Sequence, residues 1–102
     1  MIIDFTGKTV IVTGGSRGIG AAISLLFASS GANVMIDYLP VDRDFEGLKQ
    51  VEHEVLQIGG SVDSFSGNIA SSVDMEKLCT RTMERFGRLD ILVNSAGYTK
   101  PV

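Results

Sequence analysis

Gly14, Gly18 and Gly20 lie close together near the start of the chain, with Gly15, Ser16 and Arg17 between the first two. Ordering glycine costs backbone entropy, so a cluster of this kind between two apolar runs indicates a specific use. Gly14 would permit a tight turn, Gly18 would let the backbone approach a phosphate, and Gly20 would let a helix lie close against a strand. Backbone amides at the start of a helix, a serine hydroxyl and a permanent arginine charge together favour an anion site.

The spacing of these glycines, Gly-x-x-x-Gly-x-Gly, differs from the more common Gly-x-Gly-x-x-Gly of dinucleotide-binding turns. Glycine-rich turns also occur in α/β proteins that bind no nucleotide, which is the simpler interpretation. Here the turn is flanked by a strand-like run and a helix-like run, and this is the context that phosphate binding requires. We therefore favour a phosphate-binding turn over a purely structural one.

The surrounding sequence alternates between strand-like and helix-like segments. Four short runs rich in β-branched or aliphatic residues, at 9–13, 33–37, 62–66 and 90–94, have the length and composition of strands. The three intervening segments carry stripes of mostly apolar residues at helical spacing, and we expect each stripe to be the buried face of a helix. The stripes consist of Ile19, Ile23, Leu26 and Phe27 in the first segment, Phe45, Leu48, Val51 and Val55 in the second, and Met75, Leu78, Cys79, Thr82, Met83 and Phe86 in the third.

Glycine and serine mark the expected ends of these helices. Gly31, the glycine pair that begins at Gly59, and Gly87 follow the three stripes, and a left-handed residue commonly ends a helix at such a position. Ser71, with Asp74 three residues later, has the pattern of a helix N-cap. These helix-end signals therefore agree with the helices expected from the hydrophobic periodicity.

The elements follow one another in the order βαβαβαβ, and each interval has room for one strand and one crossover helix, which implies parallel strands. Runs 9–13 and 90–94 are almost continuously apolar, as expected of strands covered on both faces, whereas 62–66 alternates like an edge strand. With right-handed crossovers, these features predict an α/β fold with a doubly wound, Rossmann-like parallel sheet of strand order 3-2-1-4. Residues 1–102 would form one partial dinucleotide-binding Rossmann domain, truncated after its fourth strand.

Composition narrows the classes of function. The 102 residues carry 9 basic and 12 acidic side chains, a net charge of -3 and no basic patch, which argues against nucleic-acid binding. No apolar run approaches the length of a membrane span, and the start of the chain lacks the apolar core of a signal peptide, so we expect a cytoplasmic protein without membrane contact. The single cysteine, Cys79, has no partner for a disulfide and no metal-ligand spacing, so we expect no metal. His53 lies opposite an apolar stripe and should be solvated.

Two motifs together resemble one known family. The stretch TGGSRGIG at 13–20 and the stretch NSAG at 94–97 fall at the ends of the first and fourth expected strands. With the flanking GRLDILVNSAG and the second-strand segment GANVMIDY, they are similar to the classical short-chain dehydrogenase/reductase family. The resemblance extends from Lys8 to about Thr99. It implies an NAD(P)(H)-dependent oxidoreductase that reduces carbonyls or oxidises alcohols, with this chain as its N-terminal cofactor-binding part.

The resemblance also implies cofactor contacts at matching positions. These are Ser16, Arg17, Gly18 and Ile19 for the pyrophosphate and the adenosine phosphates, and Asn94, Ala96 and Gly97 for the adenine-side ribose and the bracing of the central sheet. Asn68, followed by Ile69, stands where the family usually has an aspartate that accepts a hydrogen bond from the adenine amino group, and an amide oxygen can still accept one. Ser95 replaces the usual second asparagine of the NNAG motif with a smaller hydrogen-bonding group.

The end of the second strand bears on the choice between NAD and NADP. An acidic residue there would bind the 2′- and 3′-hydroxyls of NAD and repel the 2′-phosphate of NADP. Asp37 follows the glycine cluster by about the usual interval, but the resemblance places the discriminating position one residue later, at Tyr38, on the opposite face of the sheet. Arg17 matches the family's pattern for recognising the 2′-phosphate. We expect NADP(H) to be the cofactor, with NAD as the alternative.

The family's catalytic residues have no match in this chain. They are a serine, a tyrosine and a lysine, the last two spaced Tyr-x-x-x-Lys, and the lysine lowers the tyrosine pKa for general acid/base catalysis. Asp42 lies four residues after Tyr38, and Val102 lies four residues after Tyr98. We therefore expect no catalytic residue here and an inactive chain by itself. The alternative is a non-catalytic nucleotide-binding module that pairs with full-length relatives; an α/β protein for another phosphate or adenosyl ligand is disfavoured by NSAG.

The outer edge of the expected fourth strand bears on whether the chain associates with other chains. In the predicted sheet, the outer backbone groups of 90–94 and part of the surface of the third helix lack partners within the chain. We expect a homo-oligomer, or association with a missing C-terminal segment, and stabilisation by bound nucleotide. A small carbonyl or alcohol substrate would bind only in a complete protein.

Overall fold

The computed structural model describes residues 3–95, and these form an alternating series of strands and helices. The elements are β1 (Thr9–Thr13), α1 (Gly18–Ser29), β2 (Asn33–Tyr38), α2 (Asp42–Gln57), β3 (Ser61–Ser66), α3 (Ser72–Phe86) and β4 (Ile91–Asn94). Every predicted element is present in the expected order, and the strand ends differ from the predicted ones by one residue at most.

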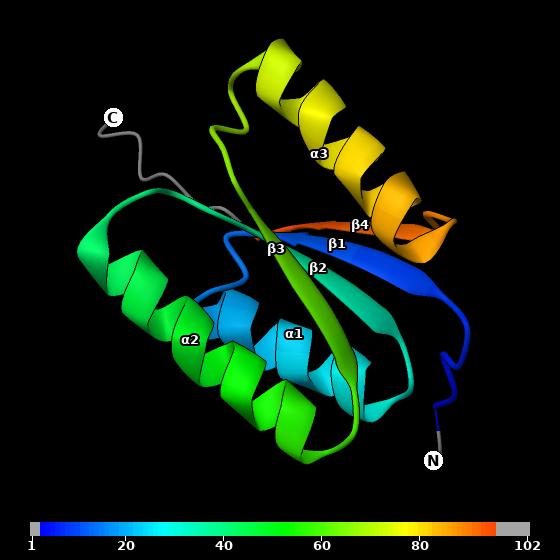
Figure 1. Ribbon diagram of the computed structural model, residues 1–102. Helices are drawn as coiled ribbons and strands as arrows, with labels where there is room; N and C mark the ends of the chain where they lie inside the picture. The colour runs from blue at the N-terminus through cyan, green and yellow to red at the C-terminus, as the bar shows by residue number, and fades with distance from the viewer. Residues whose placement is uncertain (1–2, 96–102) are drawn as a thin grey trace.

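The four strands form one parallel sheet in the order β3-β2-β1-β4, which confirms the predicted doubly wound topology. Thr13 at the end of β1 lies beside Asp37 of β2 and Asn94 of β4, and Asp37 in turn lies beside Phe65 of β3. Helices α1 and α2 cover one face of the sheet, and α3 covers the other (Figure 1). The carboxyl ends of all four strands therefore meet at one edge, which is where open α/β sheets bind their ligands.

Each face of the sheet has its own buried cluster. On the face covered by α1 and α2, the cluster consists of Val10, Val12, Ala28, Ala32, Val34, Ile36, Leu48, Val51 and Val55. On the other face, Ile11 and Met35 pack with Leu78 of α3. Because side chains alternate along a strand, β1 supplies both clusters and is buried over its whole length.

The buried face of α1 differs from the predicted one. Ile19 and Leu26 of the predicted stripe are 78% and 62% exposed, and the buried residues of the helix are Gly20, Ser24 and Ala28. Small residues let the helix axis approach the strands closely, so the contact surface is set by side-chain size and not by hydropathy. The prediction that Ile19 and Leu26 face the core was wrong.

The stripes of α2 and α3 are correct in their central residues and wrong at one position each. In α2, Leu48 and Val51 are buried with Val55, but Phe45 is 46% exposed and the buried residue of that turn is Asp44. In α3, the buried residues are Leu78 and Thr82, whereas Met83 is 48% exposed. Met75, Cys79 and Phe86 are partly buried against the α3-side cluster.

Strand β4 is less covered than its sequence predicts. Leu92 is 55% exposed, while Ile91 and Val93 are only partly buried against the cluster beneath α1 and α2. Helix α3 packs mainly against β2 and β3, so the α3-side face of β4 is left open. The expectation that β4 is covered on both faces was wrong for residues 3–95, and β3 occupies the opposite edge as predicted.

The predicted helix ends agree with the structure. The hydroxyl of Ser71 accepts a hydrogen bond from the amide of Asp74 at 3.2 Å and caps α3. Gly87 ends the same helix with φ of +79°, and Gly31 and Gly59, which follow the last turns of α1 and α2, have φ of +95° and +77°. Only glycine adopts these left-handed angles without strain.

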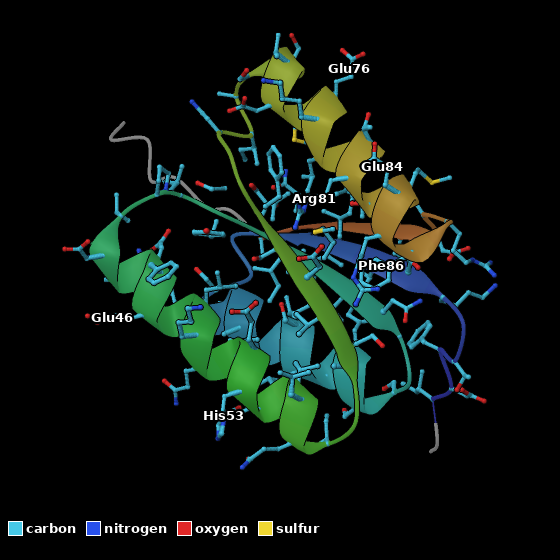
Figure 2. The ribbon with its side chains drawn as sticks, viewed as in Figure 1. Glu46, His53, Glu76, Arg81, Glu84 and Phe86 are labelled. Carbon is cyan, nitrogen blue, oxygen red and sulfur yellow. The ribbon has the colours of Figure 1, made fainter. Side chains whose placement is uncertain are left out.

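The outer faces of the helices carry the polar side chains. Glu46 and His53 project from α2, and Glu76 and Glu84 project from α3, all into solvent (Figure 2). The expectation of a solvated His53 is thus confirmed. Within residues 3–95, no helix is both long and apolar enough to cross a bilayer.

Candidate functional site

A cleft of about 670 Å³ opens at the carboxyl edge of the sheet. Its walls come from the turn after β1, the end of β2, the first turn of α2, the loop after β3 and the residue after β4. The lining residues are Gly14, Ser16, Arg17, Gly18, Asp37, Tyr38, Leu39, Asp44, Gly67, Asn68, Ile69, Ala70 and Ser95. Residues far apart in the sequence therefore meet here because the parallel strands end together.

The glycine turn presents open backbone to this cleft. Gly14 and Gly18 have φ of +66° and +59°, and a Cβ atom on Gly18 would meet no atom within 4 Å. The amides of Gly14 and Gly15 donate to the carbonyl of Asp37 at 2.9 and 3.3 Å and are therefore occupied. Arg17 is the N-cap residue of α1 and makes no side-chain cap hydrogen bond, so the amides of the first turn of α1 are available to an anion.

Two further glycines let neighbouring elements approach the turn. A Cβ atom on Gly20 of α1 would meet the carbonyl oxygen of Gly14, so the helix can begin this close to the turn only with glycine at that position. A Cβ atom on Gly47 of α2 would meet the carbonyl oxygen of Ser16. The turn is therefore held between α1 and α2 by close backbone contacts.

An ion pair joins the turn to α2. Nε of Arg17 lies 2.7 Å from Oδ1 of Asp44, in an ion pair whose geometry is not that of a well-angled hydrogen bond. The side chain of Asp44 is 12% exposed and that of Arg17 is 50% exposed. Asp44 thus holds Arg17 from the side of α2, and Arg17, whose side chain is half exposed, lines the cleft.

Asp37 and Tyr38, at the end of β2, point to opposite faces of the sheet. Asp37 is in phase with Met35, lies on the side of α3 and is 3% exposed. Tyr38 is half-buried, and its ring centroid lies 6.4 Å from that of Phe45 of α2. Both residues line the cleft. Because side chains alternate along a strand, these two neighbours contact different layers of the fold.

The environment of Asp37 disfavours its charge. Oδ1 of this carboxyl is buried and has no hydrogen-bond partner within residues 3–95. Burial, and then the negative charge of Asp74 in the first turn of α3, raise the pKa of Asp37 to about 7, although the nearby amide of Gly67 lowers it. The structure thus places a buried carboxyl at the edge of the cleft, and one of its two oxygens, Oδ1, has no hydrogen-bond donor within the described residues.

The loop after β3 is held by its own hydrogen bonds. Oδ1 of Asn68 accepts from the amide of Ala70 at 2.9 Å, and the carbonyl of Asn68 accepts from the amide of Ser71 at 2.9 Å. The amide of Asn68 donates to Oδ2 of Asp74 at 2.8 Å. The amide oxygen of Asn68 therefore already has a structural role in the turn.

Polar side chains tie the ends of β1 and β4 together. Oδ1 of Asn94 accepts a hydrogen bond from the hydroxyl of Thr13 at 2.9 Å. The hydroxyl of Ser95 donates to the carbonyl of Thr13 at 2.5 Å. Asn94 and Ser95 thus brace the two central strands at the edge where the cleft opens.

Comparison with known proteins identifies the family. The family model for short chain dehydrogenases matches residues 8–102. The chain belongs to the short-chain dehydrogenase/reductase family. Among curated members of this family, the L-fucose dehydrogenase of Rattus norvegicus is 45% identical over 97 residues, and the 3-oxoacyl-[acyl-carrier-protein] reductase of Synechocystis is 34% identical over 95 residues. The matches cover 95% and 93% of this chain but 33% and 37% of those proteins, so the chain spans about a third of their length.

Solved structures of short-chain dehydrogenases/reductases have the same architecture. A dehydrogenase/reductase from Sinorhizobium meliloti is 42% identical, with a TM-score of 0.86 over 94% of this chain and 37% of that one. A short chain dehydrogenase from Burkholderia cenocepacia, solved in complex with NADP, is 39% identical, with a TM-score of 0.85 over 93% of this chain and 38% of that one. The family resemblance read from the two sequence motifs is confirmed.

The cleft brings together most of the cofactor positions that the family resemblance implies. Among those positions, it is lined by Gly14, Ser16, Arg17, Gly18, Asp37, Tyr38, Asn68 and Ile69. Ile19 is exposed on α1, Gly20 is buried behind the turn, and Asn94 braces β1 against β4; none of these three lines the cleft. Ala96 and Gly97 lie outside the described residues, as do Tyr98 and Lys100.

Sequence reasoning missed the two residues of α2 that hold the glycine turn, Asp44 and Gly47. A signal for Asp44 was available, because it precedes Leu48 by four residues and Val51 by seven and so heads the buried stripe of the helix. An acidic residue expected on the buried face of a helix needs a cation nearby, and Arg17 in the glycine turn is a candidate for that cation. Gly47 gives no such signal, since its contact is with Ser16 on another element.

Proposed function

We propose that this protein binds NADP(H) as the cofactor-binding part of an oxidoreductase that transfers hydride between a nicotinamide ring and a carbonyl or alcohol substrate. The observation that carries the proposal is the position of Arg17, which lies beside the uncapped N-terminus of α1 in a cleft at the carboxyl edge of the sheet. An anionic cofactor would meet both the guanidinium and the positive end of the helix dipole there. The NADP complex of the Burkholderia cenocepacia relative supports the same cofactor.

The residues of the cleft suit a dinucleotide. Its volume of about 670 Å³ is within the range of roughly 300–1,000 Å³ of small-molecule sites. The first-turn amides of α1 and the open backbone at Gly18 would hold the pyrophosphate, while Ile69 offers a partly buried apolar side chain to the adenine. The bound nicotinamide would supply or accept the hydride, and the contribution of this chain is to bind and orient the cofactor.

The same surroundings favour the 2′-phosphate of NADP. The family's discriminating position holds Tyr38, which packs toward Phe45 and carries no negative charge to repel a phosphate. Asp37 lies on the other face of β2, away from this position. Arg17 is held in the cleft by Asp44, and a positioned guanidinium is well suited to bind a phosphate.

The proposal is tested by titrating the protein with NADPH and with NADH while following nicotinamide fluorescence. Arg17→Ala should raise the Kd for NADPH by roughly tenfold, because it removes a charge-assisted hydrogen bond, and should raise the Kd for NADH by much less. The control is Arg81→Ala, which removes an equal charge that pairs with Asp63 at 3.1 Å outside the cleft. Equal weakening of both cofactors by Arg17→Ala would overturn the NADP preference, and no binding of either cofactor to the wild type would overturn the function.

A non-catalytic binding role is the second candidate. Neither tyrosine in the sequence has a lysine four residues later, since those positions hold Asp42 and Val102. We expect the 102-residue chain by itself to bind NADPH without turnover. Sustained loss of nicotinamide absorbance in the presence of a carbonyl substrate would contradict this expectation.

A further inference from the structure

Helix α2 restrains the side chain of Arg17 at two points. A Cβ atom added to Gly47 of α2 would lie 3.2 Å from the Cβ atom of Arg17, so the helix backbone passes close to the base of this side chain. Further along the side chain, Nε lies 2.7 Å from Oδ1 of Asp44, which precedes Gly47 by about one helical turn. A half-exposed arginine otherwise has many rotamers open to it, so these two contacts limit the directions that the guanidinium can take.

The carboxylate of Asp44 depends on Arg17 in turn. Asp44 is 8% exposed, and its Oδ1 atom is buried. Within residues 3–95, Arg17 is the one cation that forms an ion pair with Asp44, and the amino end of α2 adds only the partial charge of its amides. Breaking such a pair leaves a buried charge without compensation, which is costly. We therefore expect the pair to persist when a ligand binds in the cleft.

A pair that persists decides how Arg17 can meet a phosphate. A guanidinium has five N–H donors in one rigid plane, and Nε, the nitrogen beside Asp44, carries one of them. A phosphate must then bind donors on the two terminal nitrogens, in the plane that Asp44 helps to set. If Arg17 were unpaired, the ligand itself would have to order this long side chain, and that cost is subtracted from the affinity.

We propose that Asp44 is a positioning residue for cofactor choice, which acts through Arg17 by ordering the guanidinium for the 2′-phosphate of NADP(H). This inference rests on the proposed function. NAD(H) carries a hydroxyl group in place of that phosphate, so the ordering of Arg17 favours NADP(H) alone. The charge of Asp44 acts in the opposite direction, because a carboxylate repels a phosphate. The test must therefore separate the acceptor from the charge.

Two neutral variants make this separation. Asp44→Asn keeps an oxygen that can accept the Nε–H bond of Arg17, whereas Asp44→Ala keeps none. Asp44→Ala should bind NADPH roughly two- to tenfold more weakly than Asp44→Asn, which is the range for ordering one long side chain. The two variants should bind NADH alike, and titration with nicotinamide fluorescence measures all four affinities. Retained NADH binding also shows that the variants fold.

The route of the effect is tested in an Arg17→Ala background. There, Asn and Ala in place of Asp44 should give equal affinities for NADPH, because the side chain that they position is gone. The matched control is Asp42→Ala, which removes an exposed acid from the same first turn of α2. Asp42 has no ion pair within residues 3–95, so its loss should leave the ratio of NADPH to NADH affinity unchanged.

Three results would overturn the assignment. They are equal NADPH affinities for the two Asp44 variants, a difference of the same size for NADH, and a difference that survives the loss of Arg17. If Asp44→Ala does not fold, Asp44→Leu takes its place, because leucine is similar in shape to aspartate and has no acceptor. NADPH binding by the wild type without a difference between the variants removes this assignment and leaves the proposed function, whereas binding of neither cofactor removes both.

Discussion

The surroundings of Asp37 disfavour the ionised form of its carboxyl and so raise its pKa. An acid whose pKa rises from 3.8 to about 7 on folding holds its proton more tightly in the native state than in the unfolded chain. Over the window between these two values, the native state binds more protons than the unfolded state. The free energy of unfolding therefore falls as the pH rises through this window, and the loss is complete above pH 7.

We expect Asp37→Asn to be more stable than the wild type at a pH of about 8, and to lose this advantage toward a pH of about 4. The difference at the higher pH is at most about 4 kcal/mol, from the size of the shift. Urea denaturation of both proteins across this range measures it. Asp90→Asn is the control of opposite sign, because Arg88 holds the pKa of Asp90 at about 2, so this variant should destabilise at pH 8. A pH-independent difference for Asp37→Asn would contradict the account.

At the scale of elements, the contact between α2 and the glycine turn depends on the missing side chain of Gly47. Replacing glycine by alanine inside a helix ordinarily stabilises it by about 1 kcal/mol. At Gly47 the added methyl group would meet the carbonyl oxygen of Ser16, so Gly47→Ala should instead destabilise by about 1–3 kcal/mol and weaken NADPH binding. Gln50→Ala, on an exposed position of the same helix, should change stability by less than about 0.5 kcal/mol. A Gly47→Ala variant more stable than the wild type would show that α2 does not press on the turn.

The sequence predicts the existence and order of the elements far better than their contacts. Local signals such as the N-cap at Ser71 and the glycine after α3 act within one turn of chain, so spacing alone reveals them. Hydropathy misplaces the buried face of α1, because the close approach of the helix to the sheet selects Gly20 and Ser24 over the larger Leu26.

In the candidate site too, features set by local sequence were predictable and features set by tertiary contacts were not. The glycine turn and Arg17 are contiguous in the sequence, and their spacing is sufficient to predict an anion site. The pairing of Arg17 with Asp44 depends on how α2 crosses the turn, and the occupied oxygen of Asn68 depends on the path of a loop. Such contacts are tertiary: helical spacing can place Asp44 on the buried face of α2, but it does not identify Arg17 as its partner.

At the scale of the whole molecule, apolar surface remains exposed around α3 and β4. Leu92, Val73 and Met83 are 55%, 58% and 48% exposed, and within residues 3–95 β4 pairs with β1 on one side only. Exposed apolar side chains next to an open strand edge favour association. Sedimentation velocity over a range of micromolar concentrations should therefore show self-association, and Leu92→Lys should reduce it. A monodisperse monomer for the wild type would contradict this expectation.

The central claim is that a dinucleotide lodges its phosphates against the first turn of α1. The most direct measurement is the change in amide chemical shifts of ¹⁵N-labelled protein as NADPH is added. We predict saturable shifts for Gly18, Ile19 and Gly20 together with the 68–70 loop on the opposite wall of the cleft. Shifts confined to a different surface, such as the side of α3 around Thr80 and Glu84, or no shifts at millimolar NADPH, would contradict the account.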